Sequence, residues 1–257
     1  MKPLEGRVAL VTGSGRGIGR AIAERLAELG ADIAINYRRD EEAAQEAVAA
    51  IEAKGQKAKA YGASVADCDA CEKMIADVVT DFGSLGILVN NAGIASRGNT
   101  VEGTDPKEFE RVVHTHAFSA FYLSHFALPH LRAAGRGDII MITSVATLKM
   151  SPNGAPYNVG KAAMEALAMT LSKEVNQDGI FVNIVAPGLT VTEMGDRLAQ
   201  ATTGVASISE LDARSAFGHV LLPEEVANVV GFLCSPDNTY VTGEKISLDG
   251  GNLWAED

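Results

Sequence analysis

Residues 8–19 read VALVTGSGRGIG, and the alanine-rich run RAIAERLAELG follows them at 20–30. The stretch predicts an apolar strand, a glycine-rich turn and a helix in direct succession. In that order, the backbone N–H groups of the turn and the N-terminus of the helix can hold a pyrophosphate. The glycines at 13, 17 and 19 follow the spacing Gly-x-x-x-Gly-x-Gly, with an extra glycine at 15. We therefore predict a dinucleotide-binding unit at the start of the chain.

The rest of the chain alternates short β-rich runs with alanine-rich helical stretches. Strands are expected at 7–12, 32–37, 57–61, 86–90, 138–143, 180–186 and 244–248. Helices are expected at 17–29, 41–54, 67–81, 105–134, 155–176 and 223–234. This alternation predicts an α/β fold, namely a Rossmann-type doubly wound parallel sheet, in a single domain that spans residues 1–257.

One long segment, 190–218, interrupts this regular pattern. It lacks a steady apolar period and is rich in Thr, Ser, Gly and Ala. A weakly patterned segment beside a catalytic rim is often a lid, so we predict a substrate lid at about 190–218. The alternative is a surface excursion with one short helix.

Composition and charge limit the classes of partner. The 257 residues are 47% hydrophobic and include 26 glycines, which suffices for a sizeable core in one domain. The formal charge of −11 argues against nucleic acid or an anionic membrane as partner, because both repel an acidic surface. The sequence has no run of eighteen apolar residues and no signal-peptide layout at its N-terminus, so a cytoplasmic location is expected.

Cys68 and Cys71 form a Cys-x-x-Cys pair, which in another setting suggests a redox dithiol or half of a zinc site. Zinc needs further ligands, yet Cys234 is distant in sequence and no second pair has metal spacing. The five histidines also lack a His-x-x-x-His spacing tied to a carboxylate. No metal is expected.

Tyr157 and Lys161 form a Tyr-x-x-x-Lys pair within the helix expected at 155–176. Residues at i and i+4 share a helix face, so the ammonium of Lys161 can lie beside the phenol. A phenol has a reference pKa of about 10, and a neighbouring cation favours its ionised form. Ser144 follows the strand expected at 138–143 and so lies at a carboxyl strand end, where open α/β sheets bind ligands. The glycine turn, Ser144, Tyr157 and Lys161 follow one another in this order along the chain. Together they predict a nicotinamide-dependent redox enzyme.

The end of the second expected strand bears on which nicotinamide cofactor binds. It reads Asn36-Tyr37-Arg38-Arg39 and has no carboxylate at its tip, where an NAD enzyme places one on the adenosine ribose. An arginine fork suits a phosphate, so Arg38 or Arg39, with Arg16 from the glycine turn, is predicted to clamp the 2′-phosphate of NADP. The alternative is that both arginines merely solvate the start of a helix beside the acidic residues 40–42.

Taken together, TGSGRGIG (12–19), NNAG (90–93), Ser144, Tyr157-x-x-x-Lys161 and Pro187-Gly188 resemble the short-chain dehydrogenase/reductase family. The resemblance covers nearly the whole chain, through LDGG at 248–251. The segments NAGIASRG and VTGEKISLDGG are most similar to the 3-oxoacyl-thioester (acyl-carrier-protein) reductase branch, which shades into sugar, steroid and polyketide reductases.

The resemblance implies roles for these residues. Tyr157 is expected to be the general acid/base, Lys161 to lower its pKa and bind the nicotinamide ribose, and Ser144 to orient the carbonyl or hydroxyl. Val65 and Asn91 are expected near the adenosine, and Thr190 near the nicotinamide. The full set expected at the cofactor comprises Gly13, Ser14, Arg16, Gly17, Ile18, Gly19, Arg38, Arg39, Ser64, Val65, Asn91, Gly93, Tyr157, Lys161, Pro187, Gly188 and Thr190.

Two positions depart from the family pattern. Twenty-eight residues before Ser144, where the family usually has an Asn that stabilises a proton relay, this chain has His116. An imidazole titrates near neutrality and is a candidate relay member, the alternative being a histidine packed in a slightly altered helix. Ser64 stands where many relatives have an Asp at the adenine amine, and its hydroxyl can still accept a hydrogen bond.

These observations predict an NADP(H)-dependent oxidoreductase that interconverts a secondary alcohol and a ketone. The alternatives are a non-redox enzyme on the same scaffold and a non-catalytic NADP-binding protein. Gly135 and Asp178 stand where fatty-acid reductases of the branch place basic residues for a carrier protein, although Arg132 and Arg136 are close by. We therefore expect a small free ketone, alcohol or thioester as substrate. The resemblance also implies a homotetramer or homodimer.

Overall fold

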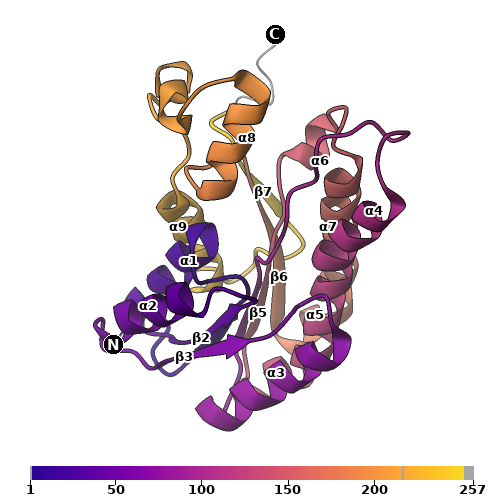
Figure 1. Ribbon diagram of the computed structural model, residues 1–257. Coiled ribbons are helices and arrows are strands. Elements are labelled where there is room, and N and C mark those ends of the chain that lie inside the picture. The colour runs from indigo at the N-terminus through magenta and orange to yellow at the C-terminus, as the bar shows by residue number, and fades with distance from the viewer. Residues whose placement is uncertain (1, 216, 252–257) are drawn as a thin grey trace.

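The computed structural model describes residues 2–215 and 217–251 and shows one parallel sheet between two layers of helices (Figure 1). The seven strands follow the order β3-β2-β1-β4-β5-β6-β7. Their bounds are β1 Val8–Val11, β2 Asp32–Tyr37, β3 Ala58–Gly62, β4 Ile87–Asn90, β5 Gly137–Ile142, β6 Ile180–Pro187 and β7 Lys245–Leu248. The predicted Rossmann-type doubly wound sheet is thus confirmed, and each expected strand is present within two residues of its predicted ends.

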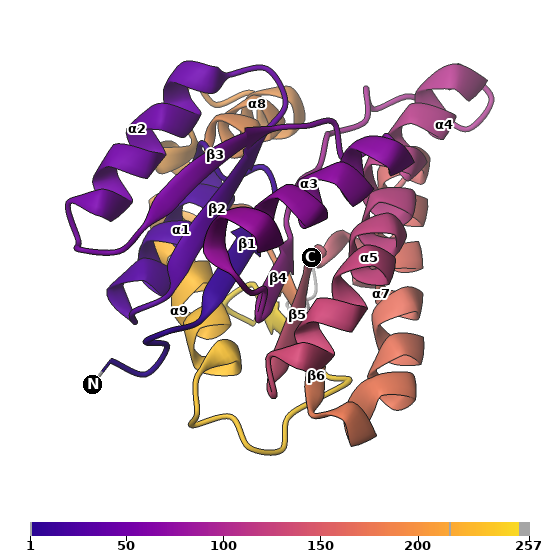
Figure 2. The ribbon, with the colours of Figure 1, turned by 90° about the horizontal axis from the view of Figure 1, so that it is seen from below.

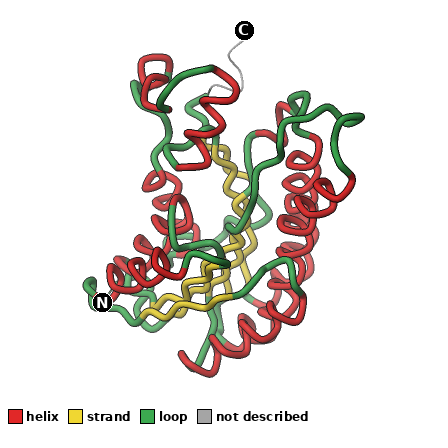
Figure 3. The backbone as a smooth tube through the Cα atoms, in the orientation of Figure 1, coloured by secondary structure: helices red, strands yellow, loops and turns green. Residues whose placement is uncertain are grey.

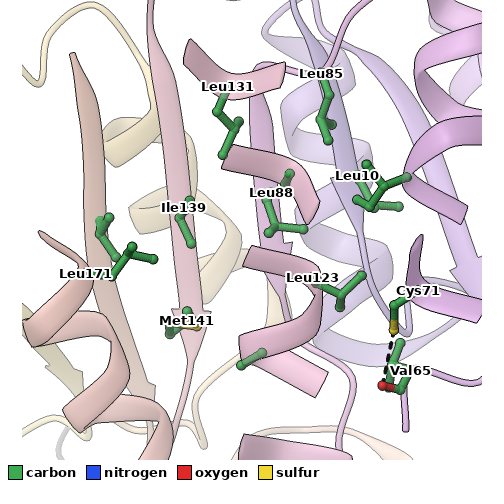
Figure 4. Packing of buried hydrophobic residues seen from close by; sticks show 14 of the residues in the cluster. Leu10, Val65, Cys71, Leu85, Leu88, Leu123, Leu131, Ile139, Met141 and Leu171 are labelled. Atoms are coloured by element: carbon green, nitrogen blue, oxygen red, sulfur yellow. Dashed lines mark hydrogen bonds between the residues drawn. The ribbon is translucent and has the colours of Figure 1, made fainter. Parts of the chain in front are cut away.

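Helices cover both faces of the sheet (Figure 2). One layer contains α1 Gly17–Glu28, α2 Glu41–Glu52 and α9 Pro223–Cys234, and the other contains α3 Cys68–Phe82, α5 Ser119–Ala133 and α7 Ala155–Val175. Each layer encloses its own apolar core against the sheet. Figure 4 shows the second core, where Leu88 and Met141 of the strands meet Leu123 and Leu131 of α5. A sheet buried on both faces explains why its strands are continuous apolar runs.

Aspartate caps mark the starts of α2 and α3. The Asp40 carboxylate accepts from Ala43 N at the start of α2, and Asp67 does the same from Ala70 N at the start of α3. Such caps satisfy N–H groups that have no partner within the helix. These two caps therefore help to set where α2 and α3 begin.

The helix predicted as one element at 105–134 is divided into three. It comprises α4 Pro106–Val113, a π-helical turn at His114–Phe118 and α5. A π-turn inserts one extra residue into the helix and often marks a functional site. The continuous apolar pattern conceals this break, because a single inserted residue hardly changes the period of the surrounding helix.

The segment 190–218 contains α8 Glu193–Thr203 and a 3-10 helix at Ile208–Arg214. Two further short elements were not predicted, α6 Ala146–Lys149 and a 3-10 turn at Asn176–Asp178. The segment with α8 and the long loop 91–105 extend beyond the same end of the sheet, on opposite sides of the strand ends (Figure 3). This end is the carboxyl end of the strands, where doubly wound folds bind their ligands.

Candidate active site

The glycine-rich turn directly follows β1 and leads into α1. Gly13 and Gly17 have φ of +62° and +57°, which glycine adopts without the steric cost that a Cβ would bring. A Cβ on Gly13 would lie 3.1 Å from the Cα of Ala92, so the turn also lies close to the loop after β4. Helix α1 has no side-chain cap and no acidic residue in its first turn. Its free N–H groups and positive dipole end fit the pyrophosphate of a dinucleotide.

Asn91 holds this turn from the neighbouring strand end. Its side-chain amide donates to Thr12 O at 2.7 Å and to Gly13 O at 3.2 Å, and its backbone N–H donates to Thr12 Oγ1 at 3.0 Å. Both amide hydrogens are therefore used within the protein. Asn91, predicted at the adenosine side of a cofactor, positions the turn in this structure.

Asn36 is a second residue that holds the glycine turn, and this role was not predicted from the sequence. Its side chain, at the end of β2, accepts from Gly13 N at 3.2 Å and donates to Tyr61 O at 3.2 Å and Ala63 O at 3.1 Å. The side chain is buried, with 2% exposed. The available signal was an amide inside an otherwise apolar strand, because buried polar groups need partners.

Ser144, Tyr157 and Lys161 come together at the carboxyl end of β5, as predicted. Lys161 is buried, and its Nζ donates to Ile142 O at 2.7 Å and lies 5.7 Å from the centre of the Tyr157 ring. The Ser144 hydroxyl hydrogen-bonds the Tyr157 phenol and accepts from Ala146 N at 3.1 Å. Polar groups at the end of β5 and on α7 thus lie together in one cluster.

The pKa values at this site differ from the expectation. Desolvation raises the pKa of Tyr157, and the hydrogen bond from Ser144 opposes that shift only partly. Burial is the dominant cause, and Lys161 is not among the causes of this shift, so the expected lowering of the Tyr157 pKa by Lys161 stays a prediction. Burial also lowers the pKa of Lys161 to about 7, against the opposing charge of Glu165.

His116 lies in the π-helical turn, directly beside the catalytic groups. Its ring stacks edge-on against Tyr157, with the ring centroids 5.3 Å apart, and its Nε2 lies 2.8 Å from Ile94 O. Burial and the charge of Lys161 lower the pKa of His116 to about 3. This shift favours the neutral imidazole at physiological pH, and the relay role of His116 stays a prediction. Its Nδ1 is buried without a hydrogen-bond partner among the described residues.

Gly93 makes room for this histidine. A Cβ at Gly93 would lie 2.6 Å from His116 Cε1 and 3.6 Å from Lys161 Nζ. The expected cofactor residue Gly93 therefore adjoins the catalytic group directly, and any side chain there would displace the imidazole.

The arginines predicted to clamp a 2′-phosphate lie on two segments, the glycine turn and the end of β2. Arg38 and Arg39 are exposed at the end of β2. The guanidinium of Arg16 instead pairs with Glu193 of α8, at 2.7 Å between exposed side chains. Arg16 thus connects the glycine turn to the segment predicted as a lid.

The remaining cofactor candidates lie at two places on the rim. Val65 is buried and its carbonyl accepts from Cys71 Sγ at 3.3 Å, while Ser64 is half-buried beside it. Pro187 ends β6, and its carbonyl accepts from Val145 N at 3.1 Å, directly beside Ser144. The other residues predicted at the cofactor lie in two segments. Ser14, Gly17, Ile18 and Gly19 belong to the glycine turn and the start of α1, and Gly188 and Thr190 follow β6.

Three further observations concern cysteines, metals and membranes. Burial raises the pKa of the Cys71 thiol to about 12, which fits a structural side chain better than a reactive one. Within residues 2–215 and 217–251, no group of three or more His, Cys, Asp or Glu side chains is arranged to hold a metal ion. In the same part of the chain, none of the helices has the length and apolar character needed to cross a membrane.

Known proteins resemble this chain over nearly its full length. The family model adh_short_C2, described as Enoyl-(Acyl carrier protein) reductase, matches residues 13–252. Versicolorin reductase 1 of Aspergillus parasiticus is 38% identical over 96% of this chain and 97% of that protein. The 3-oxoacyl-[acyl-carrier-protein] reductase FabG of Staphylococcus aureus is 39% identical over 95% of this chain and 96% of that protein.

Solved structures are similar in fold and in sequence. A short chain dehydrogenase from Burkholderia cenocepacia in complex with NADP superposes with a TM-score of 0.87 at 35% identity, covering 96% of this chain and 98% of that one. An NAD+-bound xylitol dehydrogenase superposes with a TM-score of 0.90 at 30% identity, covering 97% of this chain and 100% of that one. Relatives of both cofactor types therefore share this architecture.

Proposed function

Because the chain belongs to the short-chain dehydrogenase/reductase family, we propose that it is an NADP-dependent oxidoreductase that interconverts a secondary alcohol and a ketone. The observation that carries the proposal is the group formed by Ser144, Tyr157 and buried Lys161 at the carboxyl end of β5. A proton donor, an orienting hydroxyl and a cation in one place are what carbonyl reduction requires.

The mechanism assigns one task to each of these side chains. A bound nicotinamide supplies the hydride to the carbonyl carbon, or accepts it in the reverse direction. The Tyr157 hydroxyl gives its proton to the carbonyl oxygen, which becomes the alcohol oxygen. The Ser144 hydroxyl donates a hydrogen bond that orients the substrate oxygen. The Lys161 ammonium stabilises the phenolate that Tyr157 becomes and would also help to hold the nicotinamide ribose.

NADP preference is tested by replacing the arginine that follows β2. We expect Arg38→Ala to weaken NADPH binding by about 10-fold to 100-fold and to leave NADH binding unchanged, because a charge-assisted bond to the 2′-phosphate is worth about 1.5–3 kcal/mol. Titration of nicotinamide fluorescence measures both affinities. Lys107→Ala, which removes one exposed positive charge from α4, serves as the control for net charge. Equal affinity of the wild type for NADH and NADPH contradicts the NADP assignment.

Segment 190–218 is proposed as a substrate lid. Its helix α8 carries the exposed apolar residues Met194 and Leu198, one helical turn apart, and is connected to the glycine turn through Arg16 and Glu193. Cofactor and substrate that fill the site would gain contacts with this face. We expect amide hydrogen exchange across α8 to be slower in the NADPH complex than in the free protein. Exchange at the same rate in both states would contradict a lid at this segment.

The proposed substrate is a small free ketone, alcohol or thioester. Arg132 pairs with Asp178 at 2.6 Å, and Arg136 pairs with buried Asp138 at 3.1 Å. Asp138 also pairs with Arg7 at 2.7 Å, so Arg136 shares its carboxylate, and both arginines near Gly135 already have carboxylate partners within the chain. An acidic carrier protein therefore meets no free basic pair at this place, and the net charge of −11 reduces long-range attraction further.

The proposed assembly is a homotetramer or homodimer that buries the aromatic face of the π-turn and α5. Phe118 and Phe121 on this face are 43% and 53% exposed, more than large apolar side chains usually are in a monomer. We expect sedimentation velocity to show a dimer or tetramer for the wild type and a smaller species for Phe121→Glu, because the new charge would be buried in the interface. A monomeric wild type would contradict the assembly.

A further inference from the structure

Glu165 lies in a buried polar cluster directly behind the catalytic residues. The side chains of Glu165 and Lys245 are 13% and 14% exposed, and Lys245 Nζ lies 2.8 Å from one carboxylate oxygen and 3.0 Å from the other. Thr143 Oγ1 donates to the carboxylate at 3.0 Å, and Thr147 Oγ1 lies 2.7 Å from it. Lys245 also donates to Thr147 Oγ1 at 2.6 Å. A buried ion pair persists only with such additional hydrogen bonds, so the cluster is well defined.

The cluster connects the elements that carry the catalytic residues. Thr143 precedes Ser144 at the end of β5, and Thr147 Oγ1 lies 2.8 Å from the Ser144 carbonyl. Glu165 follows Lys161 by one helical turn on α7, so both side chains share a helix face. Lys245 begins β7 and pairs in register with Ile184 of β6. One carboxylate therefore ties β5, α6, α7 and β7 together beside the active site.

Lys161 needs a compensating negative charge. Its side chain is 4% exposed, and burial disfavours an ammonium. The titratable groups that face it from its own helix are Tyr157 and Glu165, and His116 faces it from the π-turn. Tyr157 and His116 are neutral at physiological pH, since burial shifts both pKa values away from it. Among these three, Glu165 is the group that forms an ion pair, with Lys245 at 2.8 Å, and its negative charge favours the ammonium of Lys161.

We propose that Glu165, held by Lys245, is a positioning residue of the redox site, which fixes the end of β5 against α7 and keeps the ammonium of Lys161 charged. The inference rests on the proposed function for its catalytic meaning, because Lys161 matters to turnover only if the chain is a dehydrogenase. The charge relation between Glu165 and Lys161 is a property of the folded protein and can be measured without substrate or cofactor.

The experiment follows the ¹³Cε resonance of Lys161 against pH in protein labelled at lysine, with the signal assigned through Lys161→Met. Glu165→Gln keeps an oxygen that accepts from the threonines but removes the charge. We expect it to move the Lys161 midpoint to lower pH by about one unit, because an opposite charge at this range stabilises the ammonium. Glu174→Gln, an exposed carboxylate further along α7, is the matched control and should leave the midpoint in place.

Lys245→Met supplies a second variant, in case Glu165→Gln folds poorly. It removes the cation that offsets Glu165, while Thr143 and Thr147 still donate to the carboxylate, so the Lys161 midpoint should move to higher pH. An unchanged midpoint in Glu165→Gln, or shifts of the same sign in both variants, overturns the proposal and leaves a purely structural ion pair. For a purely structural ion pair, both variants lower the Tm, and the Lys161 midpoint does not move in opposite directions in the two variants.

Kinetics then distinguish this inference from the proposed function. Since Lys161 must be protonated to act, loss of its proton lowers kcat/KM as pH rises, and in Glu165→Gln this alkaline decline should begin at lower pH by the same shift as the resonance. A wild type without turnover on any carbonyl substrate refutes the proposed function, whereas the titration still decides the role of Glu165.

Discussion

Tyr157→Phe is expected to reduce kcat about 1,000-fold while NADPH binds with nearly wild-type affinity. The substitution removes only the hydroxyl, so the ring keeps its edge-on contact with His116. Without the hydroxyl, Tyr157 has no proton to give to the carbonyl oxygen, and Ser144 loses its hydrogen bond to the phenol but keeps the one from Ala146 N. Steady-state oxidation of NADPH with a carbonyl substrate, together with fluorescence titration of the cofactor, separates the chemical step from binding.

The control for this substitution is Tyr122→Phe, a half-buried tyrosine of α5 whose ring packs against Phe118 and Phe121. It removes the same hydroxyl group from a position outside the catalytic group and should leave kcat unchanged. If Tyr157→Phe retained more than about a tenth of wild-type kcat, general acid catalysis by Tyr157, which is usually worth at least about 100-fold, would be refuted.

Gly19→Ala is expected to weaken NADPH binding at least about 100-fold and to destabilise the fold by about 1–3 kcal/mol. A Cβ at this position would lie 2.5 Å from the carbonyl oxygen of Gly13 and would overlap the amide of Asn91. Backbone cannot move aside as a flexible side chain can, so the turn must open. An opened turn no longer directs its N–H groups and the start of α1 toward a pyrophosphate.

The matched control for Gly19→Ala lies in the same turn. At Gly15 the nearest atom to an added Cβ is the backbone N of Ala44, at 3.3 Å, which a shift of a few tenths of an ångström relieves. Gly15→Ala should therefore bind NADPH far better than Gly19→Ala, and thermal denaturation should show the same ranking. Equal affinities and equal Tm values for the two variants would show that close packing at Gly19 is not what shapes the phosphate site.

The local pattern of the sequence was sufficient for the fold and for the residues predicted to be catalytic. The glycine turn between β1 and α1, the alternation of apolar strands with amphipathic helices, and Tyr157 placed one helical turn before Lys161 all depend on residues close together in the chain. Strand ends in a parallel sheet gather at one edge, so Ser144 could be placed beside Tyr157 before any contact was known.

Details that depend on one inserted or distant residue were not predictable in the same way. The π-turn around His116 leaves almost no trace in the apolar period, and the role of Asn36 depends on partners in the glycine turn and on β3. The cluster of Glu165 and Lys245 joins residues that are 80 positions apart. No periodic pattern links such positions, because only the packing of α7 against the sheet edge brings them together.

The sequence by itself determined which chemical groups the site contains, and the tertiary structure decided their charge. From the sequence, Lys161 was expected to lower the pKa of Tyr157 and His116 to titrate near neutrality. The folded protein instead raises the pKa of Tyr157 and lowers those of His116 and Lys161 to about 3 and about 7. Residue type sets the ordinary pKa, but the shift comes from desolvation and from charges on other segments, which act through space and exist only once the chain is packed.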